Sequence, residues 1–212
     1  KHDPFVNFEN FPQSAPKKRP IDLQTLRMFF EYEYITELRN IARDVMKISF
    51  CLCGINLMDL FVMDKDCYDK KNNRITYNRS KTKKRRKDRA LSSIRIEPEI
   101  QGLIDKYMAK QGERLFYFGD FPDGDVFSHT ISNRIYWMCK ELNIKRMSPY
   151  WFRHTWATVA RNKCGVSKDD IDLCLNHIGN NPMADVYIDY DWSIIDIANR
   201  KVLDYVFHSD KE

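Results

Sequence analysis

The sequence contains no pair of cysteines in C-x-x-C spacing, although six of its 212 residues are cysteines. His177 also has no second histidine close to it in the sequence. A structural zinc site needs several such ligands at short spacing, so we expect neither a metal nor another cofactor. Several of the cysteines fall on the apolar faces of predicted helices, which is typical of small buried thiols in a reducing compartment.

The sequence also lacks a signal peptide and any apolar run near the length of a membrane-spanning helix. We therefore predict a soluble, intracellular protein that does not interact with a membrane. With 43% hydrophobic residues, the 212 residues suffice for one sizeable domain, or for a domain with a tail. The first residue is Lys1 rather than Met, from which we expect a piece of a longer protein.

Positive charge is concentrated in one short stretch of the chain. The formal net charge is only +5, but residues 81–89, KTKKRRKDR, hold seven basic residues and one acidic residue. Such clustering favours a polyanion over an acidic small molecule as the partner. A solvated hairpin tip explains the same stretch about equally well.

The order of the predicted elements indicates a mainly α fold with a small antiparallel β-sheet, the α+β class. Prolines and basic residues predict a linker over residues 1–20, and the folded domain then covers 21–212. No internal repeat is present. Two extended runs, 75–81 and 91–96, are predicted to be strands joined by the basic loop. Helical periodicity and capping residues predict helices over about 22–31, 36–53, 56–61, 97–110, 130–142, 148–164, 167–178, 184–190 and 193–207.

The stretch SPYWFRHTWATVA, residues 148–160, places Arg153 among aromatic residues. Ser148 and Pro149 are suited to begin a helix, so Arg153 lies in its early turns, on the less polar side. An arginine there is partly desolvated and keeps its charge, so it needs an anion. A buried carboxylate is the ordinary partner, and a phosphate, which a guanidinium binds with two parallel hydrogen bonds, is the alternative.

Four segments, taken together and in this order, resemble the motifs of the tyrosine recombinases, also called phage integrases. They are RSKT at 79–82, SPYWFRHTWAT at 148–158, LCLNHIG at 173–179 and MADVYIDY at 183–190. The resemblance spans about residues 20–210 and is greatest to integrases of Bacteroidetes mobile elements. It implies the catalytic-domain fold of that family over 21–212, with the linker leading from a missing N-terminal DNA-binding domain, and a bacterial, cytoplasmic, nucleoid-associated protein.

The resemblance also implies an activity. It is that of a site-specific recombinase or integrase, which cuts and rejoins duplex DNA at attachment sites through a covalent 3′-phosphotyrosine intermediate. The bond energy is kept in the adduct, so no ATP is required. Strand exchange would take place in a homotetramer on DNA. Two alternatives stay open: a DNA-binding relative that has lost catalysis, and an enzyme similar to the type IB topoisomerases, which relax supercoils by the same tyrosine chemistry.

By the same resemblance, Tyr187 is the nucleophile, Arg153 holds the phosphate, His177 donates a hydrogen bond to it, and Lys81 protonates the leaving 5′-oxygen. Each of these side chains also has an ordinary structural interpretation, such as a half-buried tyrosine or a surface lysine. Contacts to the DNA backbone that raise affinity without reading sequence are expected from Lys83, Lys84, Arg85, Arg86 and Lys87.

This chain departs from the family pattern at the position of the first catalytic arginine. The family has this arginine after a Thr-Gly-Leu turn, where this chain has Cys53-Gly-Ile and then Asn56. Asn56 is neutral and suited to capping the next helix. A single lost donor costs about 10²–10³ in rate in other enzymes, so we expect a replacement. Arg79 lies two residues before Lys81, on the same face of an extended strand, and we hypothesise that it supplies the missing cation. Arg74, on the opposite face, is the weaker candidate.

A second departure is Tyr150, where the family usually has a histidine, sometimes a lysine, three residues before Arg153. A tyrosine is a poor base near neutral pH. Tyr150 is therefore expected either to position a phosphate or water, or to be a core aromatic on the first turn of its helix. The last helix has two roles open to it as well, packing on its own core or docking on a neighbouring protomer.

Overall fold

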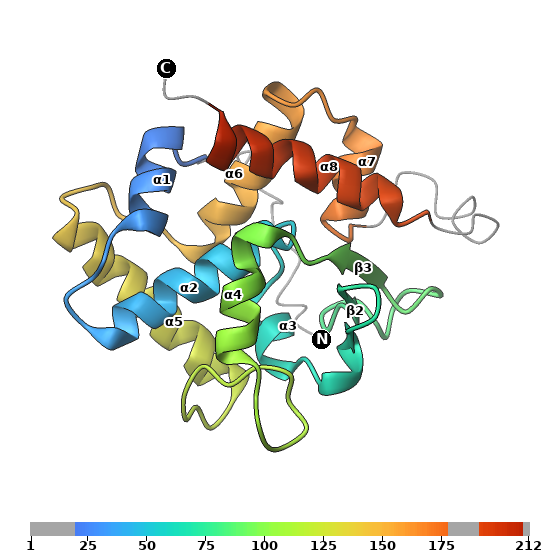
Figure 1. The fold of residues 1–212 in the computed structure, drawn as a ribbon, viewed down its shortest axis with the longest axis horizontal. Coiled ribbons are helices and arrows are strands. Elements are labelled where there is room, and N and C mark those ends of the chain that lie inside the picture. Colours follow the sequence, from blue (N-terminus) through green and yellow to red (C-terminus); the bar gives the residue numbers. More distant parts are fainter. Residues whose placement is uncertain (1–19, 178–190, 210–212) are drawn as a thin grey trace, which may run out of the picture.

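A computed structural model of the chain describes residues 20–177 and 191–209 (Figure 1). Two predicted parts of the chain lie outside these residues. They are most of the linker and the segment that contains Tyr187 and the predicted helix 184–190. The described elements are α1 (Leu23–Glu31), α2 (Glu37–Cys51), α3 (Leu57–Val62), the 3-10 turn η1 (Lys65–Cys67), β1 (Tyr68–Asp69), β2 (Arg74–Asn78), β3 (Leu91–Arg95), α4 (Pro98–Tyr107), α5 (Gly124–Glu141), α6 (Pro149–Asn162), α7 (Lys168–Cys174), α8 (Ser193–Leu203) and the π-helical turn η3 (Asp204–His208).

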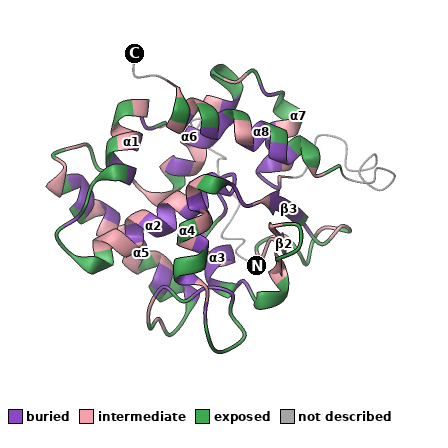
Figure 2. Cartoon of the chain, in the orientation of Figure 1, coloured by how far each residue is buried: buried purple, intermediate pink, exposed green. Residues whose placement is uncertain are grey.

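The architecture is mainly helical with one small antiparallel sheet, as predicted. Helix α2 packs against α1, α4, α5 and α6, while α8 contacts α6, α7 and β3. The sheet lies at one side of the helices, and α8 crosses the molecule next to α6 and α7 (Figure 1). Buried residues gather on the inward faces of α2, α6 and α8 (Figure 2). The helices therefore form the core, and the sheet projects from its edge.

Side-chain caps begin several helices where the sequence predicts them. The carboxamide of Asn56 accepts a hydrogen bond from the Met58 amide at 2.9 Å, and the Ser167 hydroxyl accepts one from the Asp170 amide at 3.0 Å. Ser148 lies at the N-cap position of α6 but forms no such side-chain bond. Helix α5 begins at Gly124, earlier than predicted, because the Asp123 carboxylate caps it by accepting from the Val126 amide.

The sheet has the order β1-β2-β3, with both pairs antiparallel. Strand β1 is only two residues long, too short to leave a period-2 pattern in the sequence. Strand β2 ends at Asn78, and only the bond from the Arg79 amide to the Ala90 carbonyl, 3.0 Å, extends the pairing. Lys81 lies in the turns that follow. The prediction that Arg79 and Lys81 share one face of a strand is therefore wrong.

A buried polar contact joins three helices at the centre of the core. The indole of Trp156, fully buried on α6, donates to the carboxamide of Asn199 on α8 at 2.9 Å. Asn199 in turn donates to the carbonyl of Cys51, the last residue of α2, at 2.7 Å. Both polar side chains are therefore satisfied inside the core, and their bonds orient the three helices.

Helix α8 packs on the core of its own chain, which is one of the two roles considered for it. Ile195, Ala198 and Val202 are buried, whereas Ile194, predicted on the same apolar face, is 38% exposed. Arg200 of α8 forms ion pairs with Glu97 and Glu99 at the start of α4. Asp196 pairs with Arg74 and also accepts from the Arg95 amide at 3.1 Å. These contacts connect α8 to β2, β3 and α4.

Candidate active site

Arg153 lies in the second turn of α6 with its guanidinium between the ends of two other helices. Its Nη1 donates to the carbonyl of Gly54, after α2, at 2.8 Å. Its Nη2 donates to the carbonyl of Leu175, after α7, and lies 3.2 Å from His177 Nε2. Among residues 20–177 and 191–209, no carboxylate forms an ion pair with it. The ordinary partner of a buried arginine is therefore missing from the described chain.

The turn after α2 brings the backbone close to Arg153. Cys53 and Gly54 have φ values of +56° and +69°, the left-handed region. A Cβ atom on Gly54 would lie 2.9 Å from Cα, Cβ and Cγ of Arg153. Glycine is needed there for two reasons, since the backbone conformation strains other residues and the space is occupied. The close approach is what allows the Gly54 carbonyl to accept from the guanidinium.

His177 is oriented by its own element. Its Nδ1 lies 3.2 Å from the Asp172 carboxylate, and its backbone amide donates to the Asp172 carbonyl at 2.8 Å. Burial lowers the pKa of His177 below 6.5, and the charge of Arg153 lowers it further, against the opposing effect of Asp172. The lowered pKa favours the neutral ring near pH 7. Because a guanidinium can only donate, Nε2 accepts from Arg153 and Nδ1 carries the proton toward Asp172.

Arg79 reaches the same place from the sheet. Its Nη1 donates to the carbonyl of Asn176 at 3.1 Å, next to His177 in the chain. Burial lowers the pKa of Arg153, and the charge of Arg79 adds to that effect. Arg79 also contributes to the lowered pKa of His177. The structure thus brings Arg79, Arg153 and His177 together, and we call these three side chains the cationic cluster, after the charges of its two arginines.

The other two residues considered for the first arginine are used elsewhere. Asn56 caps α3, as predicted, and so is committed to the helix start. Arg74 pairs with Asp196 and donates to Ser93, both from its Nε to the hydroxyl at 3.0 Å and from Nη2 to the carbonyl at 3.0 Å. Arg74 is therefore a structural link to α8. Of the two arginines weighed for the replacement, only Arg79 lies in the cluster.

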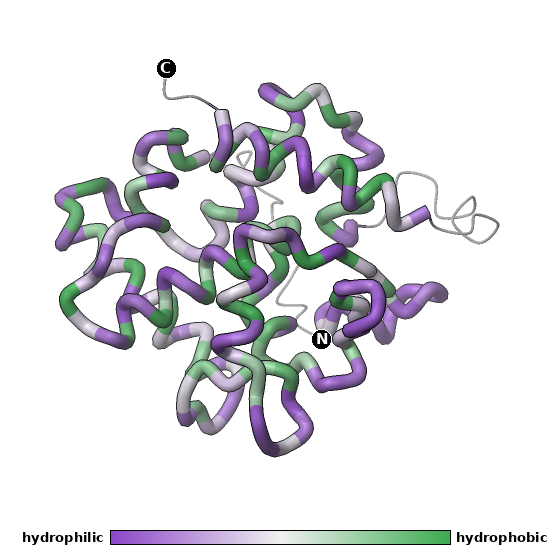
Figure 3. Tube along the Cα trace, in the orientation of Figure 1, coloured by the Kyte–Doolittle hydropathy of each residue, from purple (hydrophilic) through white to green (hydrophobic). Residues whose placement is uncertain are grey.

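Residues of the basic loop differ in exposure. The side chains of the following residues are exposed: Lys81, Lys83, Lys84, Arg85 and Lys87. Lys81 forms no hydrogen bond or ion pair with the cationic cluster in the described chain. Figure 3 shows the loop beyond β2 and β3 as predominantly hydrophilic. Arg86 is different, because only 12% of its side chain is exposed and it pairs with Asp88. Arg86 is therefore less accessible than the other four loop residues that are predicted to contact DNA.

Tyr150 is 60% exposed, so the interpretation as a core aromatic is wrong. Its ring meets that of His154, one turn later on α6, edge-on with centroids 4.5 Å apart. Tyr150 is also among the groups that affect the pKa of Arg153. It therefore lies at the surface, three residues before Arg153 on the same helix. Tyr187, the predicted nucleophile, lies outside the described residues.

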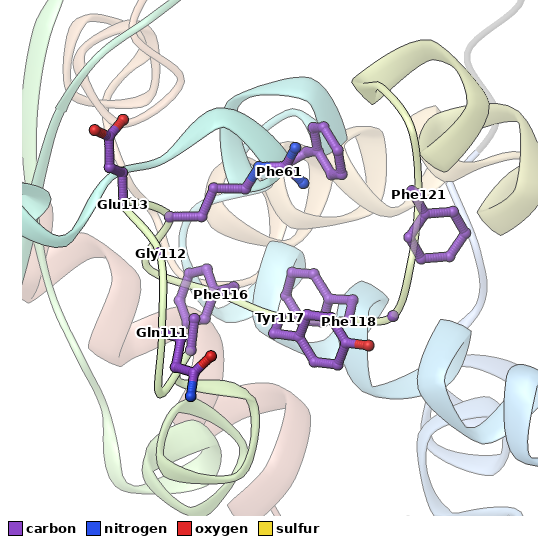
Figure 4. A pocket seen from close by; sticks show the side chains of 11 residues that line it. Phe61, Gln111, Gly112, Glu113, Phe116, Tyr117, Phe118 and Phe121 are labelled. Atoms are coloured by element: carbon purple, nitrogen blue, oxygen red, sulfur yellow. The ribbon is translucent and has the colours of Figure 1, made fainter.

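Residues 20–177 and 191–209 contain no group of three or more His, Cys, Asp or Glu side chains that could hold a metal ion. None of the helices formed by these residues is long and apolar enough to cross a membrane. A pocket of about 240 Å³ lies between Phe61 and the segment 109–121 (Figure 4). None of the predicted site residues lines it.

Comparison with known proteins gives a likeness of structure. No protein-family model matches the sequence, and no curated protein matches it. Among solved structures, the integrase of the transposon Tn1549, in complex with a circular intermediate DNA, superposes with a TM-score of 0.58 and 12% sequence identity. The match covers 84% of this chain and 64% of that one. The chain shares the fold of that integrase. Because the match covers 64% of the integrase chain, the present chain spans less than two thirds of its length.

The approach of Gly54 to Arg153 predicts an unequal response to alanine at two glycines. Gly54→Ala should lower the free energy of unfolding by about 2–4 kcal/mol, from backbone strain plus overpacking against Arg153. Gly165 has a similar φ of +67° but nothing within 4 Å of an added Cβ, so Gly165→Ala carries the backbone strain alone. Urea unfolding of both variants measures the difference. Equal losses would contradict the close approach.

The environment of His177 predicts its titration. Its pKa is expected below 6.5 because burial and Arg153 disfavour the imidazolium. As the pH falls below about 6.5, the unfolded chain takes up this proton first, so His177 lowers folding stability there and has no effect above it. NMR titration of the ring, assigned with His177→Gln, measures the pKa. Asp172→Asn should lower it further, and a pKa at or above 6.5 in the unchanged protein would refute this electrostatic account.

Proposed function

We propose that this chain is the catalytic domain, residues 21–212, of a site-specific DNA recombinase or integrase that works through a covalent 3′-phosphotyrosine. The observation that carries the proposal is the cationic cluster, in which Arg153 has two carbonyls and an imidazole as partners but no described carboxylate. A similar fold occurs in a transposon integrase that was solved with DNA. The resemblance of the sequence to integrases of Bacteroidetes mobile elements agrees with that likeness.

The cluster suits a phosphodiester for electrostatic reasons. Arg153 and Arg79 repel each other, and one anion between them relieves that repulsion. A bound phosphate also offsets the effect of Arg153 on His177, which favours a protonated ring able to donate to the phosphate. Donors set in place beforehand stabilise the charge that develops on the non-bridging oxygens in the transition state. Arg79 then takes the role that Asn56 cannot fill.

The reaction proposed is a transesterification. The Tyr187 hydroxyl gives its proton to a water molecule and attacks the scissile phosphorus, forming the tyrosine–phosphorus bond while the bond to the 5′-oxygen breaks. Lys81 gives a proton to that oxygen. Tyr150, exposed beside Arg153, positions the phosphate or a water molecule. The reverse reaction with a new 5′-hydroxyl completes strand exchange, without ATP, metal or cofactor.

DNA is held outside the cluster by the exposed basic residues of the loop. Lys83, Lys84, Arg85 and Lys87 supply charge to the phosphate backbone, so binding weakens as salt rises. The substrate is a duplex attachment site, the working assembly is a homotetramer on DNA, and the setting is the bacterial cytoplasm at the nucleoid. Asn56 favours one other candidate, a DNA-binding relative without catalysis, because no arginine occupies the family's first position.

Covalent trapping separates these two functions. Nicked duplexes with a randomised cleavage region, which lose the leaving strand after attack, should yield a protein–DNA adduct on a denaturing gel. Tyr187→Phe should abolish the adduct because the nucleophilic oxygen is gone, whereas Tyr190→Phe, the matched control, should keep it. Binding without any adduct would favour the non-catalytic relative, and an adduct that survives in Tyr187→Phe would exclude this nucleophile.

Arg79 is tested by comparing chemistry with binding. Arg79→Ala should lower the single-turnover cleavage rate by about 10²–10³ while DNA affinity changes little, because its charge acts at one phosphate. Arg85→Ala, in the exposed loop, should lower affinity and leave the rate at saturating DNA unchanged. Near-normal cleavage by Arg79→Ala would rule out its role as the replacement cation.

A further inference from the structure

Asn176 lies between α7 and His177 and contacts the hairpin with its carboxamide and its backbone carbonyl. It is only 4% exposed. Its Nδ2 donates to the carbonyl of Ala90 at 2.8 Å, and its Oδ1 accepts from Nη1 of Arg86 at 2.9 Å. Its backbone carbonyl accepts from Arg79 at 3.1 Å. One buried side chain thus joins the loop beside His177 to the base of the basic loop.

The backbone of Asn176 has a separate effect. Its φ of +50° lies in the left-handed region, where asparagine and glycine are tolerated best. Helix α7 ends at Cys174. Asn176 then turns the chain so that the His177 amide returns to the Asp172 carbonyl. The imidazole then lies between Asp172 and Arg153. The left-handed turn therefore sets the direction of the His177 ring.

The contacts of the side chain form a closed ring. Asn176 donates to Ala90, and the Ala90 amide donates to the Asp88 carboxylate at 3.0 Å. Asp88 is paired with Arg86 through two hydrogen bonds, and Arg86 returns to Asn176. Arg86 also donates to the His177 carbonyl at 3.2 Å. Arg86 and Asp88 pair with each other within this ring, and only 12% of the Arg86 side chain is exposed.

We propose that Asn176 is a positioning residue that couples the basic hairpin to the His177 loop: its backbone orients His177, and its carboxamide fixes the hairpin that carries Arg79 and Lys81. The assignment rests on the proposed function for its effect on cleavage. The ring itself does not depend on that function. Arg86 and Asp88 complete the same ring and act with Asn176.

Glycine at this position separates the two effects. Asn176→Gly keeps the left-handed backbone without strain and removes the carboxamide, so His177 stays oriented while the hairpin is released. Asn143 is the matched control, because it also has a positive φ, +53°, but is exposed at the end of α5. Asn143→Gly should leave both the hairpin and the activity unchanged.

Limited trypsin digestion tests the ring without reference to activity. The loop 81–89 is rich in trypsin sites, and its local opening determines how fast it is cut. Asn176→Gly should raise the rate of cleavage in this loop about tenfold over the unchanged protein and over Asn143→Gly. Arg86→Gln should have the same effect. Arg85→Gln is the control, because it removes one exposed trypsin site and leaves the ring intact. Unchanged protection in both Asn176→Gly and Arg86→Gln would overturn the ring.

Single-turnover cleavage tests the consequence for catalysis. Asn176→Gly should cleave a normal duplex about 10–100 times more slowly, because the hairpin cations are displaced. A duplex with sulfur in place of the 5′-bridging oxygen needs no proton donor for its leaving group, since a thiolate leaves readily. The variant should recover most of its rate on this substrate if displacement of Lys81 is the main defect. A mere loss of folded protein would slow both substrates equally.

The outcomes separate this inference from the proposed function. If the unchanged protein forms no adduct, the proposed function fails, and the digestion result still decides whether the ring holds the hairpin. Suppose instead that the unchanged protein cleaves DNA. If Asn176→Gly then cleaves each substrate as fast as the unchanged protein, Asn176 is not a positioning residue. A normal rate on the oxygen substrate together with a freed loop would equally refute the coupling.

Discussion

The charge of Arg153 is the constraint on which the site depends. A guanidinium cannot lose its proton in a protein, and this one is desolvated between two helix ends. Its hydrogen-bond partners are the carbonyls of Gly54 and Leu175, which lie just after α2 and α7. Helix C-termini carry partial negative charge, so they stabilise the cation without neutralising it. Arg79 adds a second positive charge nearby. The cluster is therefore both stably held and electrostatically ready for an anion.

The frame of the site is made of three chain turns with left-handed residues. Gly54 lies in the turn after α2, Asn176 lies in the turn after α7, and Ala90, with φ +53°, lies just before β3. Each turn directs a backbone carbonyl to a polar group of another element: Gly54 to Arg153, Asn176 to Arg79, and Ala90 to Asn176. Backbone groups move less than long side chains. Three elements far apart in the sequence are consequently held in one place by contacts between side chains and these carbonyls.

Local chemistry predicted much of the fold, whereas the contacts between elements could not be predicted. The caps at Asn56 and Ser167 and most helix positions follow from neighbouring residues, and the structure confirms them. Arg79 lies in the cluster, but through its bond to Asn176 and not through the strand geometry first used to place it. The burial of Arg86 depends on Asn176, some ninety residues away in the sequence. The exposure of Tyr150 depends on which face of α6 points to solvent. No periodicity encodes these features.

The most direct measurement is a crystal structure of the chain with a nicked duplex bound. The account predicts that non-bridging oxygens of one phosphate lie within hydrogen-bond distance of the guanidinium groups of both Arg153 and Arg79, with His177 as a further donor. It would be contradicted by DNA bound only through the exposed residues 83–87, with no phosphate at Arg153 and its charge neutralised instead by a carboxylate of the chain itself.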